Sequence, residues 1–191
     1  EIFPMLLVVV LTTFILAWFY LLPNDFIEYS KSLITTVSFT SNYYFYFSDY
    51  KFEEAKSLLN PLFHTWAISV LIQFYTLFPI ILFILFKYFR KYMIYFLILV
   101  FLISLGSADW ISRKYDSSSF YFINTRIWEF LAGSILAYFQ VENKQINRNQ
   151  RLNFLMSNFG IILLAYPIIF FNNEMYYPSY STLLPIFGVC I

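Results

Sequence analysis

The stretch PLFHTWAISVLIQFYTLFPIILFILF occupies residues 61–86 and decides the class of fold. It contains no Asp, Glu, Lys or Arg, and the first charged side chain after it is Lys87. A helix rises about 1.5 Å per residue, so roughly 20 apolar residues cross a hydrocarbon core about 30 Å thick. The stretch therefore predicts a membrane-spanning helix.

This helix also carries polar side chains, which in lipid must find partners inside the protein. When successive residues are turned by about 100°, one stripe of the helix holds Thr65, Ser69, Gln73 and Thr76. A neighbouring stripe holds His64, Leu71 and Tyr75. These stripes have two interpretations: they form hydrogen bonds between helices of a bundle, or they line a polar cavity.

Composition supports a membrane protein. Of the 191 residues, 60% are hydrophobic and only 12% are charged, whereas a soluble domain is about half apolar and about a quarter charged. The net charge of +1 argues against nucleic acid as a partner. The single cysteine, Cys190, excludes an internal disulfide and a cysteine-based zinc site, and the single histidine excludes a histidine-rich metal site. We therefore expect no metal.

The apolar runs predict an all-α fold, a polytopic transmembrane helical bundle. About five full spans are expected, at residues 2–22, 61–86, 92–106, 120–139 and 152–171. Residues 26–47 predict a short or re-entrant helix, because Ser41 and Asn42 interrupt their apolar part. A further span begins at Leu183, and residues 109–119 are expected to form a polar loop.

Charge predicts the orientation in the membrane. The two short loops at residues 87–91 and 140–151 are basic, with Glu142 as their only acidic residue. The opposite loops contain more acidic than basic residues. Short basic loops stay in the cytoplasm, which predicts that His64 lies near the outer face.

Two charges, Arg126 and Glu129, occur six and nine residues inside the predicted span 120–139. Residues three apart share a helix face, and an ion pair would lower the cost of placing charges in lipid. Gly133 and Ala137 continue this face, and small residues at that spacing allow another helix to approach closely. The pair is interpreted either as structural or as a group that orients a substrate in a cavity.

Residues 64–79 resemble the signature of the membrane acyltransferase 3 family, His-Thr-Trp-Ser-Leu-Ser-Val-Glu-Glu-Gln-Phe-Tyr followed by Phe-Pro. The matching residues are His64, Thr65, Trp66, Ser69, Val70, Gln73, Phe74, Tyr75, Phe78 and Pro79. The two glutamates of the signature are replaced by Leu71 and Ile72.

Other segments resemble the same family: residues 22–26, residues 39–43 with Asn42, residues 177–185, and the set Tyr121, Arg126, Trp128, Glu129 and Gly133. The resemblance covers most of the chain. We therefore expect residues 1–191 to be part of a single acyltransferase 3-like membrane domain. The chain has no initiator Met and stops within an apolar run, so this domain is expected to be truncated at both ends.

The resemblance implies an O-acyltransferase, with acetyl as the expected group, which moves it from cytoplasmic acyl-CoA to a hydroxyl of a cell-surface glycan. Acyl-CoA would be a co-substrate with no bound cofactor. The lipid bilayer and the glycan would be the other partners, and the location would be the bacterial inner membrane, in a multi-pass arrangement. The catalytic histidine of the family would lie before Glu1. The candidate site residues are therefore Asn42, His64, Trp66, Ser69, Gln73, Tyr75, Arg126 and Glu129.

Two alternatives stay open. A polytopic transporter or carrier could also contain an intramembrane ion pair. A catalytically degenerate acyltransferase homologue would account for the loss of both glutamates at Leu71 and Ile72.

Overall fold

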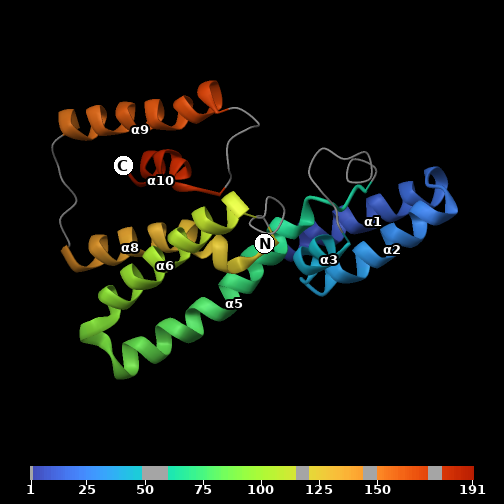
Figure 1. Ribbon diagram of the computed structural model, residues 1–191, viewed down its shortest axis with the longest axis horizontal. Helices are drawn as coiled ribbons and strands as arrows, with labels where there is room; N and C mark the ends of the chain where they lie inside the picture. Colours follow the sequence, from blue (N-terminus) through green and yellow to red (C-terminus); the bar gives the residue numbers. More distant parts are fainter. Residues whose placement is uncertain (1, 49–59, 115–120, 144–149, 172–177) are drawn as a thin grey trace. The chain divides into compact units, whose positions relative to one another are not determined.

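The computed structural model describes residues 2–48, 60–114, 121–143, 150–171 and 178–191, and every regular element in these ranges is helical (Figure 1). The α-helices are α1 (Ile2–Tyr20), α2 (Pro23–Val37), α3 (Ser41–Phe47), α5 (Thr65–Tyr88), α6 (Met93–Lys114), α8 (Ile127–Asn143), α9 (Gln150–Phe170) and α10 (Leu183–Cys190). Short 3₁₀ turns are η1 (Arg90–Tyr92), η2 (Ile123–Thr125) and η3 (Tyr180–Thr182). The predicted all-α class is confirmed.

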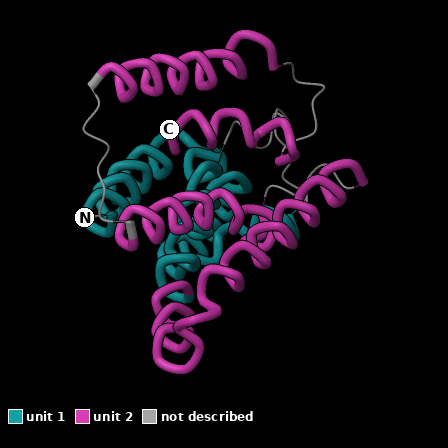
Figure 2. The backbone as a smooth tube through the Cα atoms, turned by 90° about the vertical axis from the view of Figure 1, so that its left-hand side faces the viewer, with its two compact units in different colours: residues 1–77 teal, residues 78–191 magenta. Residues whose placement is uncertain are grey.

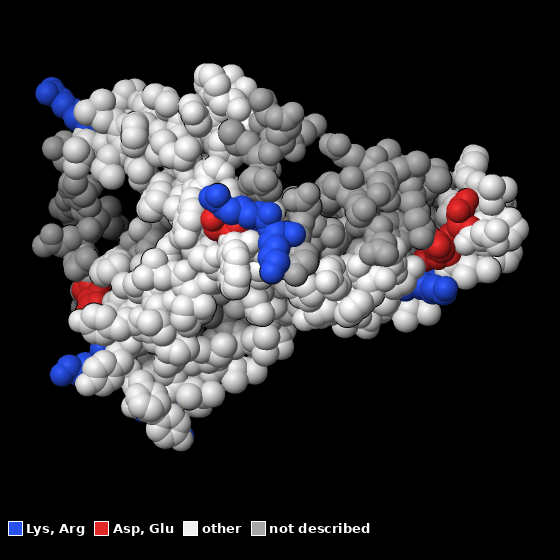
Figure 3. All heavy atoms as spheres, in the orientation of Figure 1, with Lys and Arg blue, Asp and Glu red and all other residues white. Residues whose placement is uncertain are grey.

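Among the described residues, four helices are long and apolar enough to cross a membrane: Ile2–Tyr20, Thr65–Tyr88, Arg90–Lys114 and Arg151–Phe170. Their apolar side chains are mostly exposed, as at Phe19 (76%) and Ile168 (84%). On the face drawn in Figure 3, charged side chains form only a few small patches. Apolar surface of this extent needs lipid rather than water around it, so the protein is a multi-pass membrane protein.

The expected boundaries are corrected at three places. The helix expected at residues 120–139 begins only at Ile127, after a 3₁₀ turn, and its 17 residues leave it outside the four candidate spans. Helix α6 continues to Lys114 through part of the expected polar loop, where Asp109 and Arg113 pair one turn apart at 2.8 Å, a spacing that supports a helix. The expected short helix at residues 26–47 is two helices, α2 and α3.

The chain folds as two compact units, Glu1–Leu77 and Phe78–Ile191, and helix α5 contributes to both (Figure 2). In the first unit, Pro23 opens α2 directly after α1, where its missing N–H is harmless. The small core of this hairpin contains Ala17, Tyr29 and Leu62. The hydroxyls of Tyr29 and Thr13 share a hydrogen bond of 3.0 Å, which joins α2 to α1.

In the second unit, α6 packs on α8 and α10 packs on α9 (Figure 1). Leu105, Ala108 and Trp128 form the core between α6 and α8. The crossing of α9 and α10 is made by two glycines, since a Cβ on Gly160 would lie 2.7 Å from the carbonyl oxygen of Gly188. Only residues without a side chain permit this approach of two helices.

Candidate functional site

Most of the polar stripe of α5 forms hydrogen bonds to α2, α3 or the turn between them, whereas Thr76 donates to the carbonyl oxygen of Ile72 in its own helix at 2.8 Å. The hydroxyls of Thr65 and Thr36 lie 2.8 Å apart, and those of Ser69 and Ser41 lie 2.7 Å apart. Thr65 also donates to Ser41 at 3.3 Å, and all four side chains are buried. The first interpretation of this stripe, hydrogen bonding between helices, therefore describes Thr65 and Ser69.

Gln73 has a comparable role one turn further along α5. Its Nε2 donates to the carbonyl oxygen of Phe39 at 2.9 Å and to Oδ1 of Asn42 at 3.0 Å. Phe39 has φ 55°, a left-handed conformation that is uncommon outside glycine. Gln73 therefore binds the turn that breaks the predicted helix 26–47 into α2 and α3. Asn42 is fully buried at the start of α3.

The remaining candidates of this unit differ in their exposure. Tyr75 is 57% exposed, and His64 is also exposed, just before α5, with its ring edge-to-face against Phe63 at 5.3 Å. Trp66 is buried, with 8% of its surface exposed. The structure thus brings Asn42, Ser69 and Gln73 into one region of helix contacts and leaves His64 and Tyr75 at the surface of the chain.

The second unit contains the charged pair. Arg126 Nη1 lies 3.3 Å from Glu129 Oε1, and only 12% and 22% of the two side chains are exposed. The ion pair expected from their spacing is therefore present, but its predicted position within the helix is wrong. Arg126 precedes α8, and Glu129 lies in the first turn of that helix, where the positive end of the helix dipole favours a carboxylate. The apolar residues from Phe120 onward had led to the prediction that the helix begins earlier than Ile127.

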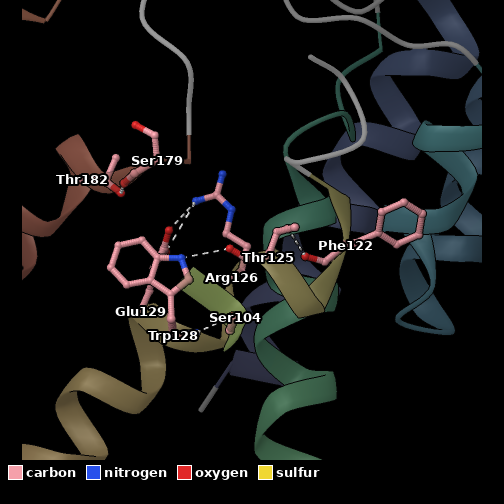
Figure 4. Close-up of polar contacts among 8 residues, drawn as sticks. All are labelled: Ser104, Phe122, Thr125, Arg126, Trp128, Glu129, Ser179 and Thr182. Carbon is pink, nitrogen blue, oxygen red and sulfur yellow. Dashed lines mark hydrogen bonds and ion pairs between the residues drawn. The ribbon is translucent and has the colours of Figure 1, made fainter. Parts of the chain in front are cut away.

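A buried set of hydrogen bonds fixes the turn that carries the pair (Figure 4). Ser104 of α6 donates to the carbonyl oxygen of Asn124 at 2.6 Å and accepts from the backbone N–H of Trp128 at 3.2 Å. The Trp128 indole donates to the carbonyl oxygen of Thr125 at 3.0 Å. Sequence reasoning missed Ser104, whose only signal was a hydroxyl within an apolar run.

An open cavity of about 310 Å³ lies between α8 and the segment that contains η3 and α10. Its lining residues are Glu129, Gly133, Thr182, Pro185, Ile186, Val189 and Cys190. A Cβ on Gly133 would meet no atom within 4 Å. The expected close helix approach at Gly133 is therefore wrong, since this glycine faces open space, and Gly160 with Gly188 makes the close approach instead.

A second carboxylate, which sequence reasoning did not single out, lies at the end of α6. Asp109 is paired with Arg113 at 2.8 Å, and one of its oxygens lies 3.5 Å from the backbone nitrogen of Tyr180 in η3. Only 11% of the Asp109 side chain is exposed. This contact joins α6 to the turn that leads into α10, and so supports one wall of the cavity.

Chemically, the site of the second unit combines a guanidinium, a carboxylate and an apolar cavity. Charges that are mostly withdrawn from water act more strongly on a bound polar group than exposed charges do. Within the described ranges, no group of three or more His, Cys, Asp or Glu side chains could hold a metal ion. The arrangement suits a ligand with one polar, hydrogen-bonding end and one apolar end.

One comparison with known proteins identifies a class. A family model described as an acyltransferase domain matches residues 2–191. A protein of Haemophilus influenzae, described only as uncharacterized, is 27% identical over 193 residues, which cover 97% of this chain and 78% of that protein. No solved structure matches the chain.

Proposed function

Because the chain belongs to the acyltransferase 3 family, we propose that it is a membrane O-acyltransferase that moves an acyl group, acetyl being the expected one, from acyl-CoA to a hydroxyl of a cell-surface glycan. The proposal includes a location in the bacterial inner membrane. The observation that carries it in this chain is the Arg126–Glu129 pair, whose carboxylate lines the cavity beside α10.

In this reaction the acceptor hydroxyl oxygen attacks the carbonyl carbon of the thioester. A carbon–oxygen bond forms, the carbon–sulfur bond breaks, and the hydroxyl proton leaves with a base before the CoA thiolate takes up a proton. We assign Arg126 and Glu129 to orienting the reacting groups: the carboxylate accepts a hydrogen bond from a hydroxyl, and the guanidinium holds that carboxylate in place. The general base is not assigned to His64, which is exposed in the other unit.

A second candidate function, a catalytically degenerate homologue, is favoured by one observation. Leu71 and Ile72 stand where the family signature has glutamates, and both are half-buried beside the polar stripe of α5. Replacing both by glutamate separates the two candidates. A large gain in acyl transfer would favour the degenerate homologue, whereas unchanged transfer would mean that these positions are structural in this chain.

The test of the main proposal measures transfer of label from acetyl-CoA to envelope glycan, using membranes that contain the full-length protein, because the catalytic histidine of the family is expected before Glu1. Glu129→Gln should lower transfer by at least about tenfold, because the acceptor hydroxyl loses the carboxylate that orients it. Glu142→Gln is the matched control, since Glu142 is an exposed carboxylate on the same helix. Absence of transfer by the folded wild-type protein, or ion-coupled solute flux without transfer, would overturn the proposal and favour the transporter alternative.

A further inference from the structure

The cavity beside Glu129 has one polar end and mostly apolar walls. Pro185, Ile186 and Val189 of α10 supply the apolar side, and Glu129 marks the end next to Arg126. Gly133 lies across from α10 and has no side chain, so the cavity stays open at this position. The part of the cavity beyond Glu129 therefore offers contact to hydrocarbon and little to a sugar.

The size of this space is informative. A water molecule takes about 30 Å³ in the liquid and a methylene group has a similar size, so about 310 Å³ has room for roughly ten such groups. An acetyl group, with two carbons, would leave most of it empty. An apolar cavity of this volume lies at the lower end of the range for small-molecule sites.

We infer that this cavity holds the acyl chain of the donor, and that Gly133 sets the longest chain that fits. The inference rests on the proposed function, because it assigns a substrate part to the same site. The thioester end of the donor lies toward Arg126 and Glu129, and the hydrocarbon lies along Gly133 and α10. Donors longer than acetyl, up to about octanoyl, are therefore expected substrates or ligands.

Cys190 gives a direct measure of occupancy, since it lines the cavity and is the only cysteine of the chain. The experiment incubates membranes that contain the protein with acetyl-, butyryl-, hexanoyl- or octanoyl-CoA, and then measures labelling of Cys190 by a membrane-permeant maleimide. Protection should strengthen with chain length, with affinity rising by about fourfold per added methylene until the cavity is full.

Two glycine variants test the role of Gly133. Gly133→Leu should abolish the added protection by hexanoyl- and octanoyl-CoA and shift acyl transfer toward acetyl. Gly106→Leu is the matched control, because Gly106 on α6 also faces open space but does not line the cavity. It should keep the wild-type chain-length profile in both measurements.

The outcomes are separable. Cys190 labelling that does not depend on chain length, or that responds equally in both glycine variants, would overturn the inference. Protection by free fatty acid but not by acyl-CoA would assign the cavity to membrane lipid and would also overturn it. If wild-type protein transfers acetyl with no change in chain-length preference in Gly133→Leu, the inference fails and the proposed function stands. If protection of Cys190 depends on chain length but the protein transfers no acyl group, the cavity binds acyl chains and the proposed function fails.

Discussion

The hydroxyl of Ser104 accepts a hydrogen bond from the backbone N–H of Trp128 at 3.2 Å, so that one helix caps the next. The first N–H groups of a helix have no partner within it, and a local Ser, Thr, Asp or Asn usually supplies the acceptor. Here the acceptor comes from α6, 24 positions earlier in the chain. The start of α8, and with it Arg126 and Glu129, is therefore held by a neighbouring helix.

Ser104→Ala should lower both stability and acyl transfer. It leaves the Trp128 N–H and the Asn124 carbonyl oxygen without this partner, which costs about 1–3 kcal/mol for a buried group. Thermal unfolding in detergent and transfer from acetyl-CoA measure the two effects. Ser104→Thr, which keeps the hydroxyl, should restore most of the transfer.

Ser107→Ala is the control for this change. Ser107 lies on the same helix, and its hydroxyl donates to the carbonyl oxygen of Ser104 within α6 at 2.8 Å. It should have little effect. Equal losses in the Ser104 and Ser107 variants would show that Ser104 does not position the start of α8.

Gln73→Ala should destabilise the first unit by about 1–3 kcal/mol, because it removes hydrogen bonds to Phe39 and Asn42 at 2.9 and 3.0 Å. The effect should be non-additive with Asn42→Ala, since the two side chains are partners. Unfolding measurements on the two single variants and the double variant give this coupling. The control is Gln140→Ala, on the exposed side of α8, which should not change stability. If the losses of the Gln73 and Asn42 variants simply add in the double variant, the two side chains are not coupled.

Gly160→Ala should destabilise the packing of α9 on α10. The added Cβ would lie 2.7 Å from the backbone oxygen of Gly188 and would force the helices apart. Such overpacking lowers the free energy of unfolding by about 1–3 kcal/mol. The control is Gly106→Ala, because Gly106 on α6 faces open space. This change should be neutral or should stabilise the protein by up to about 1 kcal/mol, since alanine favours the helix more than glycine does. The melting temperatures of the two variants should therefore move in opposite directions, and parallel shifts would contradict the crossing.

The orientation prediction is tested at Glu53 and Asn147, both outside the described residues. In a Cys190→Ser background, a cysteine at Glu53 should react with an impermeant thiol reagent added to intact cells, and a cysteine at Asn147 should not. The reason is the basic loop at residues 140–151, which favours the cytoplasm. The reverse pattern would move His64 to the cytoplasmic side.

The helices and their class could be predicted from the sequence, because length and apolar content decide them locally. The sequence predicts that Gln73, a polar side chain in lipid, needs a hydrogen-bond partner, but it does not predict which one. Its partner Asn42 is 31 positions away on another helix, and no periodicity encodes such a pairing. The Arg126–Glu129 pair was predictable, because its partners are three apart on the chain.

Two features of the site could not be predicted for physical reasons. The apolar residues from Phe120 onward are compatible with helix or 3₁₀ turn, and the choice depends on Ser104 of another helix. The spacing of Gly133 and Ala137 indicated close packing, yet spacing cannot say whether another helix is present. In the structure Gly133 borders a cavity and Gly160 meets α10.

The last prediction separates a structural from a functional role for Arg126 and Glu129. Arg126→Ala or Glu129→Gln leaves one member of a mostly buried pair without its partner. For fully buried pairs this costs roughly 3–5 kcal/mol, and the partial exposure of 12% and 22% lowers the expected loss to about 1–3 kcal/mol. Replacing both residues, Arg126→Leu with Glu129→Met, removes both charges and should restore most of the stability.

Acyl transfer decides between the two roles. If the pair serves the reaction, the double variant should be as stable as the wild type but should transfer at least about a hundredfold less, because the groups that orient the reactants are gone. Stability comes from thermal unfolding and transfer from labelled acetyl-CoA, with Glu142→Gln as the control for loss of a carboxylate on α8. A stable double variant with full transfer would reduce the pair to a packing element, and the cavity beside it would then need another polar group to hold a donor.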